Sequence, residues 1–266
     1  MILSRAGQGH TKPPVGAAIN WAHPLARGLV FVNLLNEGSG RPRNLVDGAF
    51  SVAVPTWGGS SRGNCLIAPV GIITSRTVAP RDYSQPPFTT FALYRFSAAA
   101  SYVGATMFSN ESANVNGWTM LPRAAGTNNL WLFAATGSTN SSLVTTPDIV
   151  QASAISCDGS KVRFMHQGRV SEVTASPTFT VPATFNFING GSDQGTDQIC
   201  AYVWSRALSM SEMRQLYTEP FTFLLAQSPS VQYFLPAAGG GGDPEGRLIG
   251  GKLLRGGLLR RGVLVG

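Results

Sequence analysis

The chain has 266 residues, and only 12% of them are charged, well under the roughly 25% of an average globular protein. The 31 glycines and 17 prolines separate short apolar runs, which favours many short strands joined by turns over a helical protein. The beginning of the chain lacks the apolar region of a secretory signal, and no run approaches the roughly 18 uncharged apolar residues of a membrane helix. We therefore expect neither a secretory signal nor membrane insertion.

The net charge of +7 resides mainly at the end of the chain. Residues 247–266 carry five basic residues and no acidic one. The 15 remaining basic residues and the 13 acidic ones all lie in residues 1–246, so this larger part has a net charge near +2.

Cys65, Cys157 and Cys200 are an odd number of cysteines, lie far apart and form no CxxC pair. This pattern predicts buried free thiols in a protein that folds in a reducing cytosol.

Strand-like runs begin after an extended arm. Residues 1–19 show no periodicity and contain two adjacent prolines, which predicts an arm without regular structure. Beyond it, apolar or alternating runs predict strands, with turns at 36–40, 158–159 and 190–191. The predicted strands include residues 28–32, 90–96, 130–133, 161–164 and 184–187.

One helix is predicted near the end of the body. Ser209 and Glu212 form a capping box, in which each side chain binds a backbone N–H at the helix start. Met213, Leu216 and Tyr217 follow at i, i+3 and i+4 and form one apolar stripe, and a proline then ends the run. This pattern predicts a short helix packed on a sheet.

A change of composition separates a C-terminal tail from the body. Residues 237–246 contain four consecutive glycines and predict a flexible hinge. Residues 247–266 repeat with a period of five, and paired aliphatic residues recur in each unit. Five fits neither the period of a helix nor that of a flat strand, so we predict a segment that anchors or oligomerises the protein. The predicted assembly contacts are Arg247, Leu248, Leu253, Leu254, Leu258, Leu259, Arg260, Arg261 and Val263.

Nucleic acid is not the expected partner of this tail. Its five cations could neutralise phosphates, but the tail has no aromatic residue to stack on bases, and nine of its twenty residues are aliphatic. Aliphatic residues in that number indicate burial against another protein surface.

Four segments resemble laminin-G-like jelly rolls of the concanavalin A-like lectin/glucanase superfamily. Residues 29–40 resemble the opening strand and turn, residues 44–48 the following loop, and residues 157–168 a hairpin of that family. The strongest similarity is SRALSMSEMRQLY at 205–217, which resembles the strand-to-helix closure RALSxxEIxxLY. The resemblance implies an all-β fold, an antiparallel two-sheet jelly-roll sandwich over residues 20–236 with one short C-terminal helix and an extended tail.

The acidic positions of that family are not matched. Residues 65–78 contain Ile72, Ile73 and Thr74 where the family has a strand with an acidic pair, and Gln167 stands at the place of the hairpin aspartate. Members that bind calcium use acidic residues at the rim of the sandwich. We therefore predict no bound metal and no cofactor.

Hydrolysis of a glycan requires two carboxylates that flank one bond. Hydrolases of the superfamily carry them on one strand as ExDxE, a pattern that none of the 13 acidic residues forms. The closest pair in the body, Asp193 and Asp197, is predicted to lie on a loop. The histidines His10, His23 and His166 share no spacing typical of zinc binding or of a catalytic triad. We therefore predict that the protein is not an enzyme.

The tryptophans are candidates for stacking on sugars. Trp131 and Trp204 lie inside strand patterns and are predicted to belong to the core. Trp57 and Trp118 border turns, which makes them the candidate glycan contacts, with cell-surface glycans as ligands.

The NWxxPL opening at residues 20–25, the jelly roll and the Gly-Leu-Arg tail together resemble structural proteins of tailed phages. The resemblance implies a virion structural protein, a capsid decoration or head fibre, which is made in the host cytoplasm and displayed on the virion surface. Its expected partners are capsid or tail subunits and further copies of itself, with a trimer among the symmetric arrangements. Two alternatives stay open, a tail-fibre or baseplate adhesin and a free glycan-binding lectin. A glycoside hydrolase ranks after both.

Overall fold

The computed structural model describes most of the predicted body. The described residues are 12–50, 56–67, 75–76, 86–99, 106–109, 117–124, 127–134, 137–177, 185–186 and 196–225. They belong to a compact unit, Met1–Ala226, and the second unit, Gln227–Gly266, lies outside the described residues. The predicted hinge and all the predicted assembly contacts of the tail are therefore outside the described residues.

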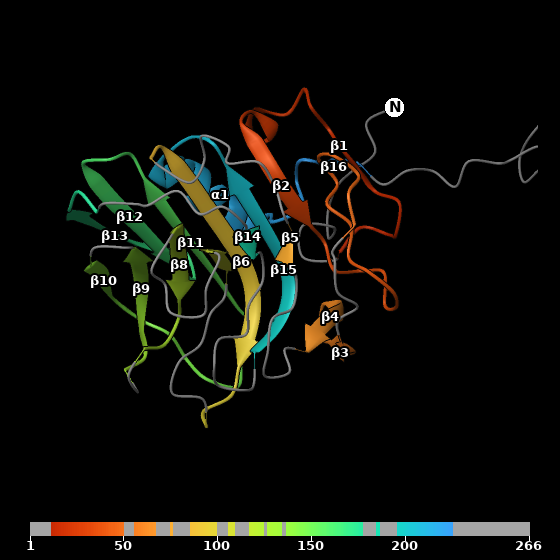
Figure 1. The fold of residues 1–266 in the computed structure, drawn as a ribbon, viewed down its shortest axis with the longest axis horizontal. Helices are drawn as coiled ribbons and strands as arrows, with labels where there is room; N and C mark the ends of the chain where they lie inside the picture. The colour runs from red at the N-terminus through yellow and green to blue at the C-terminus, as the bar shows by residue number, and fades with distance from the viewer. Residues whose placement is uncertain are drawn as a thin grey trace, which may run out of the picture. The chain divides into compact units, whose positions relative to one another are not determined.

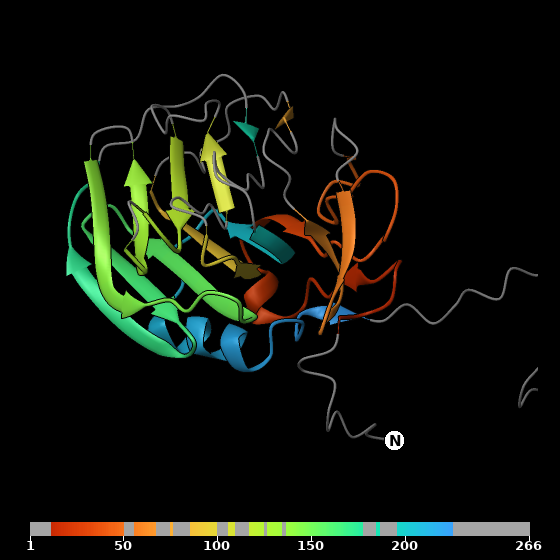
Figure 2. The same cartoon turned by 90° about the horizontal axis from the view of Figure 1, so that it is seen from below.

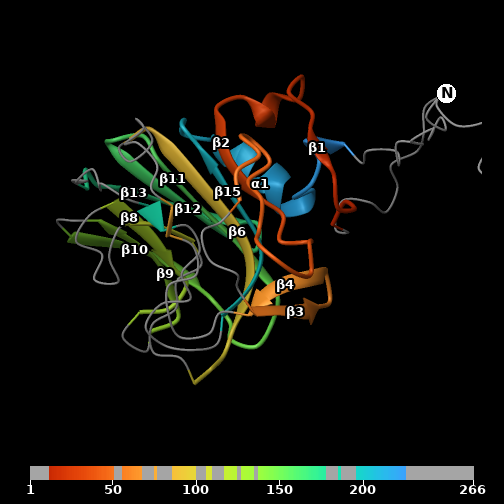
Figure 3. The same cartoon turned by 45° about the vertical axis from the view of Figure 1, so that its right-hand side comes forward.

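Two antiparallel sheets form a sandwich, as the sequence predicts (Figures 1 and 2). The larger sheet has eight strands, in the order β13 (Arg169–Thr174), β12 (Lys161–His166), β11 (Gln151–Cys157), β6 (Phe88–Phe96), β15 (Thr196–Trp204), β4 (Gly63–Ile67) and β3 (Thr56–Ser60), with β2 (Leu29–Asn33) also paired to β15. The smaller sheet has six, in the order β10 (Gly137–Val144), β9 (Asn129–Ala134), β8 (Gly117–Leu121), β7 (Thr106–Ser109), β14 (Phe185–Asn186) and β5 (Ser75–Arg76). β3 and β4 form a hairpin at one edge of the larger sheet (Figure 3).

The larger sheet is buried on both faces. Along β6, Tyr94 and Phe96 belong to the core between the two sheets, whereas Phe91 and Leu93 belong to a second core on the opposite face. A strand with two buried faces has a nearly continuous apolar sequence, which explains the apolar run at residues 90–96. The core between the sheets includes Phe88, Trp118, Leu132, Ile155 and Phe164.

Short elements cover the second core. They are the 3-10 helix η1 (Pro24–Ala26), the helix α1 (Met210–Thr218) and a ribbon of two paired strands, β1 (Ala18–Ile19) and β16 (Leu224–Leu225). Figure 2 shows α1 on the side of the larger sheet that faces away from the smaller one. In this core the rings of Tyr202, Trp204 and Phe223 meet edge to face, with centroids 5.2 to 6.2 Å apart.

The predicted start of the helix is confirmed, and so is the packing of two of the three residues of its apolar stripe. The Ser209 Oγ accepts a hydrogen bond from the Glu212 backbone N–H (3.2 Å), and the Glu212 carboxylate accepts one from the Ser209 N–H (2.8 Å), which completes the capping box. Met213 and Leu216 are fully buried, whereas Tyr217 is 38% exposed, so the stripe is narrower than predicted. No helix in the described part of the chain is long and apolar enough to span a membrane.

Arg206 gives the RALS segment a structural role. Its guanidinium binds the Glu212 carboxylate (2.7 Å) and the backbone oxygen of Arg27 (2.7 Å). The Leu208 backbone N–H donates to the Thr89 hydroxyl of β6 (2.8 Å). The segment therefore joins α1 to the N-terminal segment and to the larger sheet.

The end of the N-terminal arm is part of the body, which corrects the predicted boundary after residue 19. Ala17 and Ile19 are buried, and Ala18 and Ile19 pair with Leu225 and Leu224. A two-residue strand is too short to show a period, so the sequence carries no sign of this pairing.

The three cysteines are buried, as predicted, and free. Burial raises the pKa of Cys157 and of Cys200 to about 11, so both thiols stay protonated at neutral pH. They pack as small apolar side chains.

Candidate functional site

The two predicted glycan contacts, Trp57 and Trp118, have different surroundings in the structure. Trp118 is 1% exposed in the core between the sheets, and its ring stacks on Phe88 with centroids 4.7 Å apart. A ring with no exposed face is not available to a sugar, so the prediction for Trp118 is wrong. Trp57 is half-buried on the edge strand β3, where its Nε1 donates a hydrogen bond to the Gly40 oxygen (2.9 Å). Its role as a glycan contact stays a prediction.

Trp131 lies on the outer face of the smaller sheet, not in the core as predicted. Its neighbours in β9, Leu130 and Leu132, belong to the core between the sheets, so alternation along the strand directs Trp131 outward, where it is half-buried. Its cross-strand partners are Leu121 of β8 and Asn140 of β10. An aromatic ring missed by sequence analysis therefore stands on this surface.

β10 places a row of polar side chains beside Trp131. Ser138, Asn140 and Ser142 are exposed, whereas Leu143, on the other face of the strand, packs against the core. Alternate side chains on a strand are about 7 Å apart, which sets the spacing of Ser138 and Asn140. The register of β10 shifts beyond Asn140, so Ser142 continues the row without this regular spacing. We call the surface formed by Trp131, Ser138, Asn140 and Ser142 the outer-sheet face.

The acidic pair predicted on a loop is not placed as expected. Asp197 lies within β15, where its carboxylate accepts a hydrogen bond from the Arg95 Nε (2.8 Å). Asp193 lies outside the described residues. Further ion pairs join Asp158 to Arg163, Glu172 to Lys161 and Arg163, and Glu212 to Arg206. Within the described ranges, no three His, Cys, Asp or Glu side chains gather as a metal site would require.

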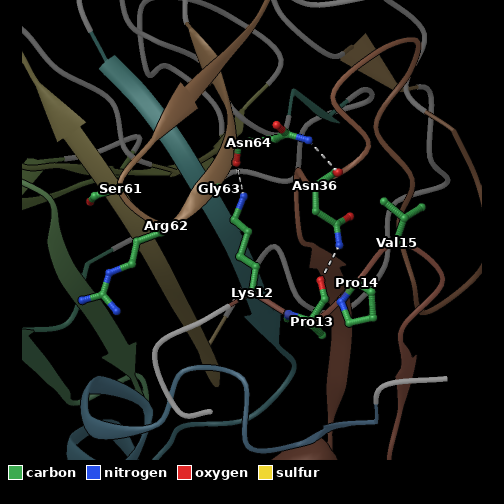
Figure 4. Close-up of a pocket in the computed structure, with 9 residues that line it drawn as sticks. All are labelled: Lys12, Pro13, Pro14, Val15, Asn36, Ser61, Arg62, Gly63 and Asn64. Atoms are coloured by element: carbon green, nitrogen blue, oxygen red, sulfur yellow. Dashed lines mark hydrogen bonds between the residues drawn. The ribbon is translucent and has the colours of Figure 1, made fainter. Parts of the chain in front are cut away.

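A pocket of about 720 Å³ lies between the N-terminal segment and the β3–β4 hairpin (Figure 4). Residues 12–15, Asn36 and the hairpin turn at 61–64 line it, and we call it the Lys12 pocket. The Lys12 Nζ donates hydrogen bonds to the backbone oxygens of Leu35 (2.9 Å) and Asn64. The Asn64 side-chain amide donates to the backbone oxygen of Asn36 (2.9 Å). The Asn36 side-chain amide in turn donates to the backbone oxygen of Pro13 (2.9 Å). These bonds join the three segments that line the pocket.

The Lys12 pocket carries positive charge. Lys12 and Arg62 both line it, and its described lining includes no acidic residue. Burial lowers the pKa of Lys12 to about 8, although neighbouring groups, Glu37 among them, act in the opposite direction. The amine is therefore mostly protonated at pH 7. A lysine with a perturbed pKa in a pocket is a frequent property of ligand sites.

A chain of polar side chains is sealed inside the sandwich. The Tyr94 hydroxyl is 2.7 Å from the Ser153 Oγ, which is 2.9 Å from the His166 Nδ1. Burial lowers the pKa of His166 to about 4, and the charge of Arg169 adds to this effect, so the imidazole is neutral at pH 7. Ser153 has no exposed surface. The serine–histidine contact therefore stabilises the interior and cannot reach a substrate.

Comparisons with known proteins place the fold. No protein-family model matches the chain, and no curated protein matches its sequence. Among solved structures, the chain is similar to a sialidase of Trypanosoma rangeli, with a TM-score of 0.55 and 12% identity over 74% of this chain and 34% of the sialidase. It is also similar to domain 4 of AbnA, a GH43 extracellular arabinanase from Geobacillus stearothermophilus, with a TM-score of 0.52 and 13% identity over 71% of this chain and 98% of that domain.

A third similar structure is the binding domain of botulinum neurotoxin serotype D, with a TM-score of 0.52 and 10% identity over 71% of this chain and 51% of that one. The chain spans about a third of the length of the sialidases that it matches. Identities this low show the fold alone. The likeness supports the antiparallel β-sandwich described above.

Proposed function

We propose that the protein is a non-catalytic carbohydrate-binding β-sandwich whose ligand lies across the outer-sheet face. The observation that carries the proposal is the Trp131 ring beside the exposed Ser138, Asn140 and Ser142 of β10. An indole ring packs on the C–H face of a sugar, while hydroxyl and amide groups exchange hydrogen bonds with sugar hydroxyls. The AbnA domain, which shares the fold, was solved in complex with arabinotriose, and this supports a sugar ligand.

The chemistry of the described acidic residues supports binding over hydrolysis. A glycoside hydrolase commonly holds two carboxylates about 5 to 9.5 Å apart on either side of the bond to be cleaved. Asp197, the described member of the closest acidic pair in the body, is bound by Arg95. The polar row beside Trp131 is uncharged. Such a surface can hold a glycan but supplies no acid or base.

Trp131→Ala is expected to weaken glycan binding about tenfold or more, equivalent to at least about 1.4 kcal/mol, because the stacking surface is lost. A glycan array first identifies a ligand for the wild-type protein, and isothermal titration calorimetry then compares the variants. Trp21→Ala is the matched control, since Trp21 is 58% exposed and lies outside the outer-sheet face. Equal losses in the two variants, or no ligand on the array, would refute the proposal.

We also propose that this module is carried on the surface of a phage particle, anchored or oligomerised by residues 247–266. The sequence supports this second function, because a glycine hinge precedes a tail in which aliphatic pairs recur every five residues among cations. Its resemblance to tailed-phage structural proteins supports capsid or tail subunits as partners. The proposal is compatible with glycan binding, since a particle-borne adhesin needs both a ligand site and an anchor.

Deletion after Gly242 is expected to leave the melting temperature of the body unchanged and to abolish oligomer formation or particle binding. The expectation follows from the hinge, because four glycines transmit little orientation between the body and the tail. Differential scanning calorimetry, analytical ultracentrifugation and binding to particles that lack the protein measure the three properties. A truncated protein that melts early, or that assembles and binds as before, contradicts the assignment.

A further inference from the structure

Lys12 brings a primary amine to the wall of a pocket that has the size of a ligand site. The pocket volume of about 720 Å³ falls within the roughly 300–1,000 Å³ of typical small-molecule sites. Figure 4 shows the Lys12 side chain extending from the N-terminal segment to the hairpin turn, where its Nζ meets the Asn64 backbone oxygen. Hydrogen bonds from Asn36 and Asn64 connect the walls, so the site is formed before any ligand enters.

The hydrogen bonds of this amine suit its neutral form. A protonated lysine has three N–H donors, whereas a neutral amine has two and a lone pair. Among the described residues, the Lys12 Nζ donates to two acceptors, the backbone oxygens of Leu35 (2.9 Å) and Asn64. The neutral amine therefore keeps both hydrogen bonds, and its lone pair points away from both oxygens.

Burial leaves much of this amine unprotonated near neutral pH. It lowers the pKa of Lys12 from 10.5 to about 8. At pH 7 about a tenth of the Lys12 amine is therefore neutral, against about one part in 3,000 for a lysine at the ordinary pKa. A desolvated lysine with a lowered pKa is an activated nucleophile.

The charge of Glu37 determines which product the site stabilises. This carboxylate acts against burial and raises the pKa of Lys12, so it favours positive charge at the Nζ atom. An aldehyde converts an amine into an imine, and the protonated imine is positive and keeps one N–H. It therefore retains the attraction to Glu37 and one of the two backbone hydrogen bonds. An acyl group would instead give a neutral amide, which lacks that attraction.

We propose that Lys12 is a covalent binding site for small aldehydes, including the open-chain form of short sugars, which it holds in the pocket as an imine. The amine lone pair attacks the carbonyl carbon, and the carbonyl oxygen takes a proton from the nitrogen, which gives a carbinolamine. The hydroxyl then takes a proton from solvent and leaves as water while the C–N double bond forms. The step needs no oxidant or reductant, and water reverses it. The carbon chain of the aldehyde lies against Pro14 and Val15.

The test is labelling of the full chain with glyceraldehyde and sodium cyanoborohydride, which reduces the imine to a stable secondary amine. The lysines of the chain are Lys12, Lys161 and Lys252, and tryptic cleavage after Arg5 separates Lys12 from the amine of Met1. Peptide mass spectrometry measures the rate at each amine. At pH 7 Lys12 is expected to react at least about tenfold faster than Lys161, because its neutral fraction is larger. This excess is expected to shrink from pH 7 to pH 9, since the neutral fraction of Lys12 levels off above pH 8.

Glu172→Gln is the matched control variant, because it frees the Lys161 amine from its ion pair with Glu172 (2.6 Å). The preference for Lys12 is expected to persist in this variant and to disappear in concentrated guanidinium chloride, where the pocket is lost. Labelling of Lys12 no faster than that of Lys161 in the folded variant, or a preference that survives denaturation, overturns the proposal. Trp131→Ala is expected to be labelled as the wild type is, so this site and the outer-sheet face can fail independently.

Discussion

Leu216→Ala is expected to lower the free energy of unfolding by about 2–5 kcal/mol, the range for a large-to-small change in a packed core. Leu216 lies on the buried face of α1 and is fully buried, in the same core as Phe91, Tyr202 and Phe223. Aromatic rings held edge to face cannot close the space that the lost methyl groups leave, so a cavity remains. Guanidinium denaturation followed by far-ultraviolet circular dichroism measures the loss.

Glu212→Ala provides the comparison on the same helix. It removes the capping bond to the Ser209 N–H and the contact with Arg206 but opens no cavity in the core. Its expected cost is about 0.5–2 kcal/mol, less than that of Leu216→Ala. A Leu216→Ala variant as stable as the wild type would show that α1 does not dock on the sheet.

Acidification from pH 6.5 to pH 4 is expected to remove about 3 kcal/mol of stability through His166 alone. Folding lowers the pKa of this histidine from 6.5 to about 4, because the buried imidazole is neutral in the native state. Between these two values the unfolded chain binds a proton that the folded chain does not. The contribution is therefore complete above pH 6.5 and is lost as the pH falls toward 4.

His166→Asn isolates this effect, since its amide can replace the Nδ1 contact with Ser153 but cannot titrate. Urea denaturation of both proteins at half-unit intervals gives the two pH profiles. The variant is expected to be less stable at pH 7 but nearly flat between pH 6.5 and 4.5. Asp158 does not interfere, because hydrogen bonds from Ser160 lower its pKa from 3.8 to about 2 and its contribution is lost below that interval. Parallel profiles would show that His166 is not the titrating group.

Features encoded within a few residues were predictable from the sequence. The helix closure depends on Ser209, Glu212 and Leu216, which lie within one short segment, and the structure forms it as predicted. The sandwich itself followed from apolar runs separated by turns and from the RALS resemblance. The strand at 90–96 even showed its two buried faces, because a continuous apolar run is typical of that environment.

Features that depend on which strands pair were not predictable. Trp131 sits between Leu130 and Leu132, so the apolar pattern of β9 does not show which side faces the second sheet. Trp118 borders a turn in the sequence, yet its partner Phe88 comes from the other sheet and covers its ring. A shift of the strand pairing by one residue exchanges the inner and outer faces of a strand, and this register is set by the neighbouring strands in the sheet.

The Lys12 pocket could not be predicted from the sequence for a related reason. Its walls come from residues 12–15, Asn36 and residues 61–64, and no single segment carries a motif. The buried chain from Tyr94 through Ser153 to His166 likewise joins three strands, with the first two residues 59 positions apart. A hydrogen-bonded group of this kind becomes visible only once the strands are aligned.

The pairing of β1 with β16 determines how the body responds to mechanical load. Ala18 lies opposite Leu225, so the chain enters the first strand and leaves the last one at the same end of the ribbon. Tension applied through the two ends would break the backbone hydrogen bonds between β1 and β16 one after another, because the force acts on each residue pair in turn. Strands pulled along their length must instead break many bonds together. On the N-terminal side the hydrogen bonds of Lys12 and Pro13 must break before the load reaches the ribbon. The body is therefore expected to yield first at these bonds and at the ribbon, while the core between the two sheets remains folded.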